Sequence, residues 1–293
     1  MYRFRRKIAA LLAAVVILTT NLGVQLLPQN IRSTAENYLS PVASAASSSI
    51  KAAVNAGGGH ALAVKNDGTV SCWGDNTYGE LGDGTKSDKL SPVNVRGIDD
   101  VVAVSSVDDT SYAVKSDGTV WKWGMVEPYI PAGTPVKVAG LQDIVDIKAS
   151  KNIYEVNDIF YLALKSDGTV WSWGDNSCGQ LGNGSKVTNY TPTQVPDLYN
   201  VIAIATGNNF SVALKSDGTV WSWGLNYSYG QLGNGNTDSS CTPAKVPGLS
   251  DITDIAAGGS HALALKKDGT VFGWGDKEAY STSSNLLSQT KIE

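Results

Sequence analysis

The stretch ALKSDGTVWSWG at residues 163–174 returns without a change at residues 213–224. Its central Asp-Gly-Thr-Val also occurs at three other places, and successive copies are 50 or 51 residues apart. The copies, which define repeats 1 to 5, start at Asp67, Asp117, Asp167, Asp217 and Asp268. An internal period of this size is typical of propellers, solenoids and arrays.

The repeated stretch predicts a tight β-hairpin. The run before Asp167 alternates small and large residues, as a strand does, and Asp-Gly favours a tight turn because glycine accepts positive φ. In the run after the turn, Trp171 and Trp173 share one face, and Ser172 lies on the other. We expect both faces to be buried, with the indoles of one sheet packed against the alanines of its neighbour.

The rest of each repeat continues the same meander. A glycine turn at residues 79–84, 179–184 and 230–235 is followed by a short strand containing a proline, at residues 191–195 and 242–246. An apolar run such as residues 201–204 then leads into the next hairpin. Four strand-like runs in about fifty residues predict one blade of a β-propeller.

These motifs closely resemble the regulator of chromosome condensation repeat, over roughly residues 50–276. The resemblance implies an all-β propeller of four-stranded antiparallel blades, usually seven, whereas this chain has about five. Repeat 2 lacks the glycine turn, since Gly124 and Pro135 are 11 positions apart, against 18 for Gly174 and Pro192. A closed five-bladed ring and a partial ring both remain open. In the closed ring, the run at residues 50–54 would complete the last blade.

The first 46 residues predict a secretory signal peptide or an N-terminal membrane anchor. Four basic residues near the start precede the apolar run 8–18, and small residues at 42–46 suit cleavage. We favour cleavage, which predicts a secreted, extracellular protein of bacterial type with a propeller at residues 47–293. The alternative is an uncleaved helix within residues 8–27, with the propeller held outside the cytoplasm.

The charge balance argues against nucleic-acid binding. The whole chain has 23 basic and 27 acidic residues, of which residues 1–46 hold five basic and one acidic. Without that segment, 18 basic and 26 acidic residues remain, which gives a net charge of about −8. An acidic surface without a basic stripe repels phosphate backbones.

The sequence offers no catalytic or metal-binding constellation, and we expect no enzyme activity, cofactor or metal. His60 and His261 occupy a position that elsewhere holds Thr110, Phe160 or Phe210, which indicates packing. The repeated aspartates suit side chain-to-backbone bonds in turns. The sequence leaves open whether oxygen atoms at alternate positions of residues 83–88 and 234–238 bind calcium. It also leaves open whether Cys178 pairs with Cys241.

The remaining candidates are surface residues that suit protein binding. Tyr78 and Tyr229 precede glycine turns, and the irregular segments of repeats 2 and 3 add aromatic and acidic residues. The predicted protein-binding residues are Tyr78, Glu127, Tyr129, Tyr154, Glu155, Asp158 and Tyr229. The alternative is that the tyrosines only cover the turns.

We therefore expect a non-enzymatic propeller that binds an unknown protein or cell-envelope partner through loops at one end of its blades. The family resemblance implies two alternatives: inhibition of β-lactamases, as by certain secreted bacterial propellers, and guanine nucleotide exchange on a small GTPase, as by nuclear members. An export signal disfavours nucleotide exchange. A hydrolase or lyase built on the end face of the propeller is a further alternative.

Overall fold

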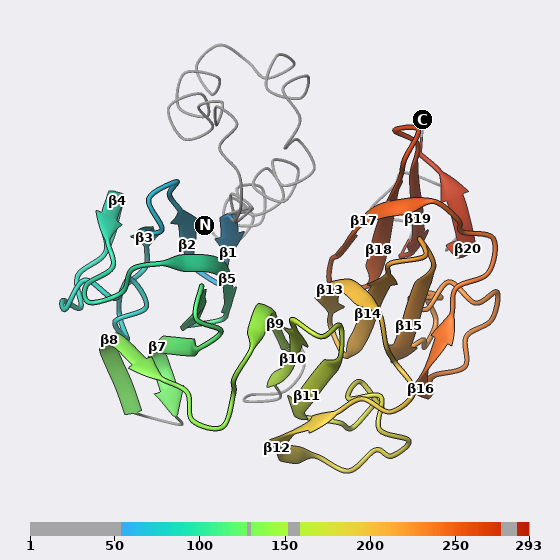
Figure 1. Ribbon diagram of the computed structural model, residues 1–293, viewed down its shortest axis with the longest axis horizontal. Coiled ribbons are helices and arrows are strands. Elements are labelled where there is room, and N and C mark those ends of the chain that lie inside the picture. Colours follow the sequence, from blue (N-terminus) through green and yellow to red (C-terminus); the bar gives the residue numbers. More distant parts are fainter. Residues whose placement is uncertain (1–53, 128–129, 152–158, 277–285, 293) are drawn as a thin grey trace. The chain divides into compact units, whose positions relative to one another are not determined.

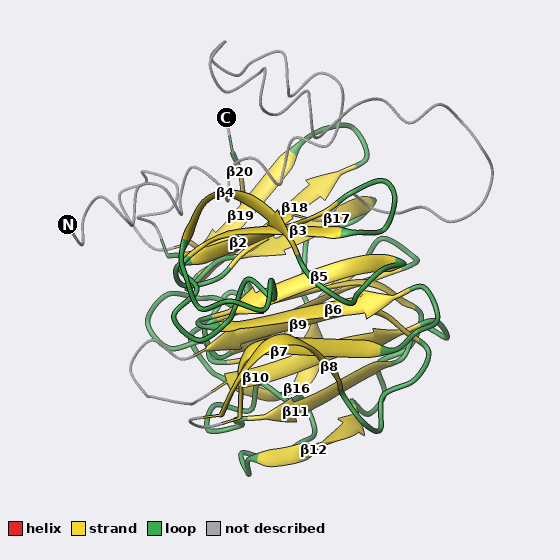
Figure 2. Ribbon diagram, turned by 90° about the vertical axis from the view of Figure 1, so that its left-hand side faces the viewer, coloured by secondary structure: helices red, strands yellow, loops and turns green. Residues whose placement is uncertain are grey.

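Over the residues that the structure describes, the protein is all-β, with five four-stranded antiparallel sheets (Figure 2). A computed structural model describes residues 54–127, 130–151, 159–276 and 286–292, so the expected signal or anchor lies outside the described residues. Within these ranges, no helix is long and apolar enough to cross a bilayer. The sheets confirm the predicted blades of a β-propeller.

Each sheet contains four consecutive strands, labelled in Figure 1. The first sheet holds β1 Val54–Ala56, β2 His60–Val64, β3 Val70–Gly74 and β4 Lys89–Asn94. The second holds β5 Val101–Val107, β6 Thr110–Lys115, β7 Val120–Glu127 and β8 Ile130–Lys137. The third holds β9 Ile144–Lys151, β10 Ile159–Lys165, β11 Val170–Gly174 and β12 Asn189–Gln194. The fourth holds β13 Val201–Gly207, β14 Phe210–Lys215, β15 Val220–Gly224 and β16 Ser240–Lys245. The fifth holds β17 Ile252–Ala257, β18 His261–Lys266, β19 Val271–Gly275 and β20 Leu286–Lys291.

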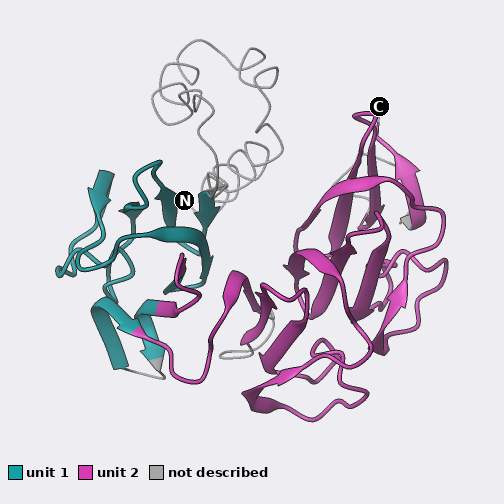
Figure 3. Ribbon diagram, viewed as in Figure 1, with its two compact units in different colours: residues 1–113, 122–136 teal, residues 114–121, 137–293 magenta. Residues whose placement is uncertain are grey.

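The chain divides into two compact units, coloured separately in Figure 3. Unit 1 comprises residues 1–113 and 122–136, and unit 2 comprises residues 114–121 and 137–293. Within unit 2, the first strands β9, β13 and β17 of successive sheets contact one another. The three sheets of unit 2 are therefore joined along their first strands, as blades are in a propeller.

The Asp-Gly turns form the hairpins that the sequence predicts. In repeat 4, the carboxylate of Asp217 accepts hydrogen bonds from the Thr219 amide at 3.0 Å and from its hydroxyl at 2.6 Å. Gly218 between them has φ +76°, which a glycine adopts without strain. The same pair of bonds joins Asp67 to Thr69 and Asp167 to Thr169, which confirms the structural interpretation of these aspartates.

The first strand does not complete the last sheet. β1 pairs with β2 through Val54 and Ala63, and β20 is already the fourth strand of the last sheet. The expectation that the N-terminal run completes the last blade is therefore wrong. The physical reason is local: only the three glycines 57–59 separate β1 from β2, so this pairing closes a very short loop.

The hydrophobic core lies between successive sheets, but the tryptophans do not face alanines there. Ala213 is the cross-strand partner of Trp221, so the alanine and the indole share one face of one sheet. That face packs on the preceding sheet, where Trp223 joins a cluster containing Phe160 and Leu162. The expected indole-to-alanine packing between sheets is wrong, because the alanines make room beside the indoles rather than opposite them.

The fourth strands lie at the outer edges of the sheets, and they contain the prolines that the sequence predicts for edge strands. Pro92 lies in β4, Pro192 in β12 and Pro243 in β16. Proline is tolerated there because the missing amide would otherwise face outward, away from the ladder.

Candidate functional site

Three long connections between the third and fourth strands share one plan, and two of them carry candidate binding residues, Tyr78 and Tyr229. These glycine-turn loops cover residues 75–88, 175–188 and 225–239. Each is organised by one fully buried asparagine: Asn76, Asn176 or Asn226. The side-chain oxygen of Asn176 accepts a hydrogen bond from the Leu181 amide at 2.9 Å, and its Nδ2 donates to the carbonyls of Ser185 and Val187, each at 3.1 Å.

The same geometry accounts for the alternate oxygens that suggested a calcium loop. In repeat 1, Nδ2 of Asn76 donates to Asp83 Oδ1 at 3.3 Å, to the Thr85 carbonyl at 3.2 Å and to the Ser87 carbonyl at 3.1 Å. The oxygens therefore converge on an amide of the protein itself. Among the residues that the structure describes, no three histidine, cysteine or acidic side chains are grouped as metal ligands.

Each glycine turn also receives the tryptophan that directly precedes the last glycine of the following hairpin. The indole Nε1 of Trp123 donates to the Glu80 carbonyl, that of Trp223 to the Gln180 carbonyl, and that of Trp274 to the Gln231 carbonyl, each at 2.8 Å. These three indoles are fully buried. The loops are thus anchored both internally and on the adjacent sheet, which makes them rigid supports.

Glycine is required where the indole meets the turn. A Cβ atom on Gly182 would lie 2.7 Å from Nε1 of Trp223, and the residue has φ +69°. Any other residue at this position would therefore be strained and would displace the indole. This contact explains the Gly-x-Leu-Gly spacing.

Tyrosines occupy the exposed part of two of these loops. Tyr78 is 37% exposed and Tyr229 is 36% exposed, while Tyr227, which the sequence analysis missed, is 74% exposed. The signal for Tyr227 was present: four positions separate Asn226 from Gly230, against three from Asn176 to Gly179. The extra residue, Ser228, has φ +65°, a strained conformation for a residue other than glycine.

The structure does not assemble the rest of the predicted protein-binding residues. Tyr129, Tyr154, Glu155 and Asp158 lie outside the described residues, and so does the side chain of Glu127, although its backbone ends β7. The described part of the candidate site therefore consists of Tyr78 in unit 1 and the pair Tyr227 and Tyr229 in unit 2.

The histidines are packing residues, as their repeat position predicts. His60 is buried, and its Nε2 lies 2.8 Å from Ser111 Oγ. Burial lowers the pKa of His60 to about 4, although Asp75 opposes this shift, and burial also lowers the pKa of His261. An imidazole that stays neutral and enclosed is poorly placed as a general base at a surface.

The three cysteines are unpaired with one another. Cys72 is buried, which raises the pKa of its thiol, and Cys178 and Cys241 are half-buried free thiols. The pairing of Cys178 with Cys241 that the sequence left open is thus not formed. Cys178 Sγ instead lies 3.5 Å from the side-chain nitrogen of Asn209.

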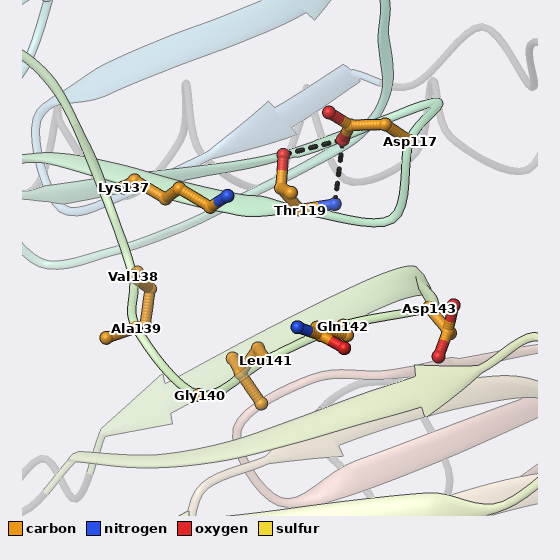
Figure 4. A pocket seen from close by; sticks show the side chains of 9 residues that line it. All are labelled: Asp117, Thr119, Lys137, Val138, Ala139, Gly140, Leu141, Gln142 and Asp143. Atoms are coloured by element: carbon orange, nitrogen blue, oxygen red, sulfur yellow. Dashed lines mark hydrogen bonds between the residues drawn. The ribbon is translucent and has the colours of Figure 1, made fainter.

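A pocket of about 380 Å³ lies beside the hairpin turn of repeat 2, within unit 2 (Figure 4). Lys137 and Gln142 lie on its two sides. Its lining includes Val138, which is half-buried, whereas the equivalent Val195 of repeat 3 is fully buried beside Gly182. Repeat 2 has no glycine turn, so this side of Val138 is left open. The pocket is lined by Asp117, Thr119, Lys137, Val138, Ala139, Gly140, Leu141, Gln142 and Asp143.

Comparison with known families decides the relationship of the chain. A profile described as "Regulator of chromosome condensation (RCC1) repeat" matches residues 67–114, 167–214 and 217–265. A second profile with the same description matches residues 52–80, 201–231 and 252–279, and together they cover more than half of the chain. The chain belongs to the regulator of chromosome condensation repeat family. This confirms the resemblance inferred from the motifs.

Curated relatives of the RCC1 repeat protein are much longer than the matched region. This chain is 35% identical over 245 residues to the human E3 ubiquitin-protein ligase HERC2, and the match covers 78% of this chain and 5% of the relative. It is 27% identical over 229 residues to the ultraviolet-B receptor UVR8 of Arabidopsis thaliana, covering 76% of this chain and 40% of the relative. The chain thus spans between a twentieth and two-fifths of these proteins.

Solved structures support the RCC1 propeller fold. Human WBSCR16 is 22% identical with a TM-score of 0.66, and the match covers 82% of this chain and 66% of that one. Prp20p from Saccharomyces cerevisiae is 21% identical with a TM-score of 0.58, and the match covers 82% of this chain and 76% of that one. At this identity the similarity establishes the fold alone.

Proposed function

We propose that this RCC1 repeat protein is an exported, non-enzymatic propeller that binds a protein or cell-envelope partner through its glycine-turn loops. The single observation that carries the proposal is the turn Tyr227-Ser228-Tyr229 in repeat 4. It presents two tyrosines on a backbone held in a strained conformation, on a loop that is otherwise anchored by buried bonds. Strain that surrounding structure maintains is concentrated at functional sites.

The support beneath this turn favours binding by preorganised aromatic anchors. Asn226 Nδ2 donates to the carbonyls of Asn236 at 3.0 Å and Asp238 at 3.1 Å, and its Oδ1 accepts from the Leu232 amide at 2.8 Å. Tyrosine loses little conformational entropy when it is buried at an interface, because it has few rotatable bonds. A rigid loop with exposed tyrosines therefore suits protein recognition more than catalysis.

Export is supported by the sequence of residues 1–46, and the absence of catalysis is supported by the histidines, of which His60 is buried and His261 is half-buried. The two histidines pack inside separate sheets, His60 in the first and His261 in the fifth. One structural relative has named partners, since the structure of Prp20p was described together with its binding properties to Gsp1p and histones. For this chain we propose a different partner, because the export signal expected in residues 1–46 would carry the propeller out of the cytoplasm.

The test is affinity capture from the native cell envelope with the full chain and two variants. We expect Tyr227→Ala combined with Tyr229→Ala to lose a partner that the unchanged chain captures. The matched control is Tyr190→Ala, because Tyr190 is 79% exposed but lies on the outer strand β12. Equal loss in both variants, or retention in both, would remove the loop from the binding site.

N-terminal sequencing of the exported product tests whether the signal is cleaved. A β-lactamase inhibition assay tests the alternative that the protein is an enzyme inhibitor.

A further inference from the structure

We propose that the turn Tyr227-Ser228-Tyr229 of repeat 4 is a two-state switch, in which the Tyr229 amide exchanges the Tyr227 carbonyl for the side-chain oxygen of Gln231. The inference goes beyond the proposed function, because the two states exist whether or not the tyrosines contact a partner. It comes from comparing the three glycine-turn loops at one position of their common plan. That position holds Glu80 in repeat 1, Gln180 in repeat 3 and Gln231 in repeat 4.

Repeats 1 and 3 pair this side chain with the amide of the residue two positions before it. In repeat 3, the Cys178 amide donates to Oε1 of Gln180 at 2.9 Å. In repeat 1, the Tyr78 amide donates to Oε2 of Glu80 at 2.7 Å. Gln180 and Glu80 are both buried, so each bond satisfies a side-chain oxygen that the fold encloses.

Repeat 4 has the acceptor but uses the corresponding amide elsewhere. The Tyr229 amide donates to the Tyr227 carbonyl at 2.8 Å, which closes a three-residue turn around Ser228. Ser228 has φ +65°, so this is a γ-turn of the rare, strained kind. Gln231 is 2% exposed, and its Oε1 is buried without a hydrogen-bond partner among the residues that the structure describes. The donor that serves this position in the other two loops is thus engaged in the strained turn.

The framework around the turn is the same as in repeat 3, so the exchange is local. Oδ1 of Asn226 accepts from the Leu232 amide at 2.8 Å, the bond that the equivalent asparagine makes in repeat 3. The Gln231 carbonyl accepts from Trp274 Nε1 at 2.8 Å, as the corresponding carbonyl of repeat 3 accepts from its own tryptophan. These bonds fix both ends of the segment, so a change of partner by one amide requires movement of residues 227–229 alone.

Opposing costs keep the two states close in free energy. The observed turn has a strained Ser228 and an unpaired, buried Gln231 oxygen, and both are unfavourable. The second state removes both costs. However, repeat 4 has one residue more than repeat 3 between its asparagine and its glycine, and without the γ-turn this extra residue has to bulge outward. We expect the second state to have a population of about 0.1–10%.

The exchange changes what the loop presents to a partner. Tyr227 is 74% exposed and Tyr229 is 36% exposed, and the bond between their backbones sets the relative positions of the two rings. When the Tyr229 amide turns to Gln231, the Tyr227 carbonyl is released as an acceptor. A partner that donates a hydrogen bond to this carbonyl favours the second state, because it replaces the lost donor.

The first experiment measures melting temperatures of the full chain and of variants in which the turn and the acceptor change separately. Gln231→Met removes an oxygen that is unpaired in the observed turn, and should leave the melting temperature unchanged or higher. Deletion of Ser228 restores the spacing of repeat 3. In that background, Gln231→Met should lower the melting temperature by about 2–4 °C, because it removes the bond from the Tyr229 amide. Gln180→Met is the matched control, and should lower the melting temperature with or without Ser228.

The second experiment tests whether both states are present in the unchanged chain. NMR relaxation dispersion should show exchange of the Tyr229 amide on the microsecond-to-millisecond timescale, and none for the Cys178 amide. Gln231→Met should abolish this exchange, because it removes the second acceptor. Ser228→Gly should reduce it, since glycine adopts positive φ without strain and stabilises the observed turn.

Each experiment can overturn the proposal. If Gln231→Met has an effect of the same sign and size with and without Ser228, the Tyr229 amide does not reach the Gln231 oxygen. If exchange of the Tyr229 amide persists in Gln231→Met, or if the unchanged chain has a single state, the turn does not switch. Because Gln231→Met and Ser228→Gly keep the length of the chain, the second experiment decides the matter even if the deletion variant folds poorly.

Discussion

The segments Val170–Gly174 and Val220–Gly224 have the same five residues, Val-Trp-Ser-Trp-Gly, and form the same strand of successive sheets. Their second tryptophans nevertheless differ. Trp223 is fully buried and donates to the Gln180 carbonyl at 2.8 Å. Trp173 is half-buried and stacks on Tyr161, with ring centroids 5.1 Å apart and an angle of 15° between the rings.

The repeats that precede the two tryptophans differ in sequence. Repeat 3 has a glycine turn whose carbonyl and glycine receive Trp223, whereas repeat 2, which precedes Trp173, lacks this turn. Local sequence therefore determines the strand, and the glycine turn of repeat 3 supplies the buried partner of Trp223. Three predictions test which properties depend on local sequence and which depend on the neighbouring glycine turn, from the largest expected effect to the smallest.

The largest effect should come from removing the buried indole. Trp223→Ala should lower the free energy of unfolding by about 3–5 kcal/mol, since it leaves a large cavity and leaves the Gln180 carbonyl with only its hydrogen bond from Ser211 Oγ. Trp173→Ala should cost clearly less, because part of that ring is already exposed. Urea unfolding measures both, with Trp223→Phe as a milder form of the first change. Equal losses at the two positions would break the comparison.

A smaller effect should follow from altering the support of the glycine turn. Asn176→Asp replaces a buried donor by an acceptor facing the carbonyls of Ser185 and Val187, and should cost about 2–3 kcal/mol. The loosened turn should also expose Trp223, which its fluorescence would report. Asn189→Asp, on the exposed outer strand β12, is the control and should be nearly neutral. Unchanged fluorescence in Asn176→Asp would show that the turn does not position the indole.

The smallest effect should be the same in both repeats, because it depends on local sequence alone. Hydrogen bonds from Thr169 and Thr219 lower the pKa of Asp167 and Asp217, respectively. Their contribution is present above the ordinary aspartate value of 3.8 and is lost as pH falls through the lowered pKa. Asp167→Ala and Asp217→Ala should therefore reduce the melting temperature slightly at about pH 6, equally, and not at strongly acidic pH. Unequal losses would mean that even the hairpins depend on their neighbours.

Much of the fold was predictable because it is encoded within a few residues. The hairpin at Asp217 needs only the turn and two alternating strands, and the edge position of Pro192 follows from its missing amide. The packing between sheets was not predictable in the same way. Which face the alanines share with the indoles, and which tryptophan is buried, depend on contacts between residues 43 positions apart, such as Gln180 and Trp223.

The candidate site was predictable only in part. Tyr78 and Tyr229 were found because they precede a recurring glycine, but Tyr227 follows from a one-residue extension that alters the backbone rather than the motif.

The prolines of the outer strands have a consequence for how the molecule meets others. Pro92, Pro192 and Pro243 interrupt the donors along the free borders of three sheets, so an extended segment from another chain has no continuous ladder to join. Backbone-to-backbone addition at the rim, the usual start of unwanted fibre growth, is discouraged in each of these sheets. Recognition is left to side chains on the connecting loops.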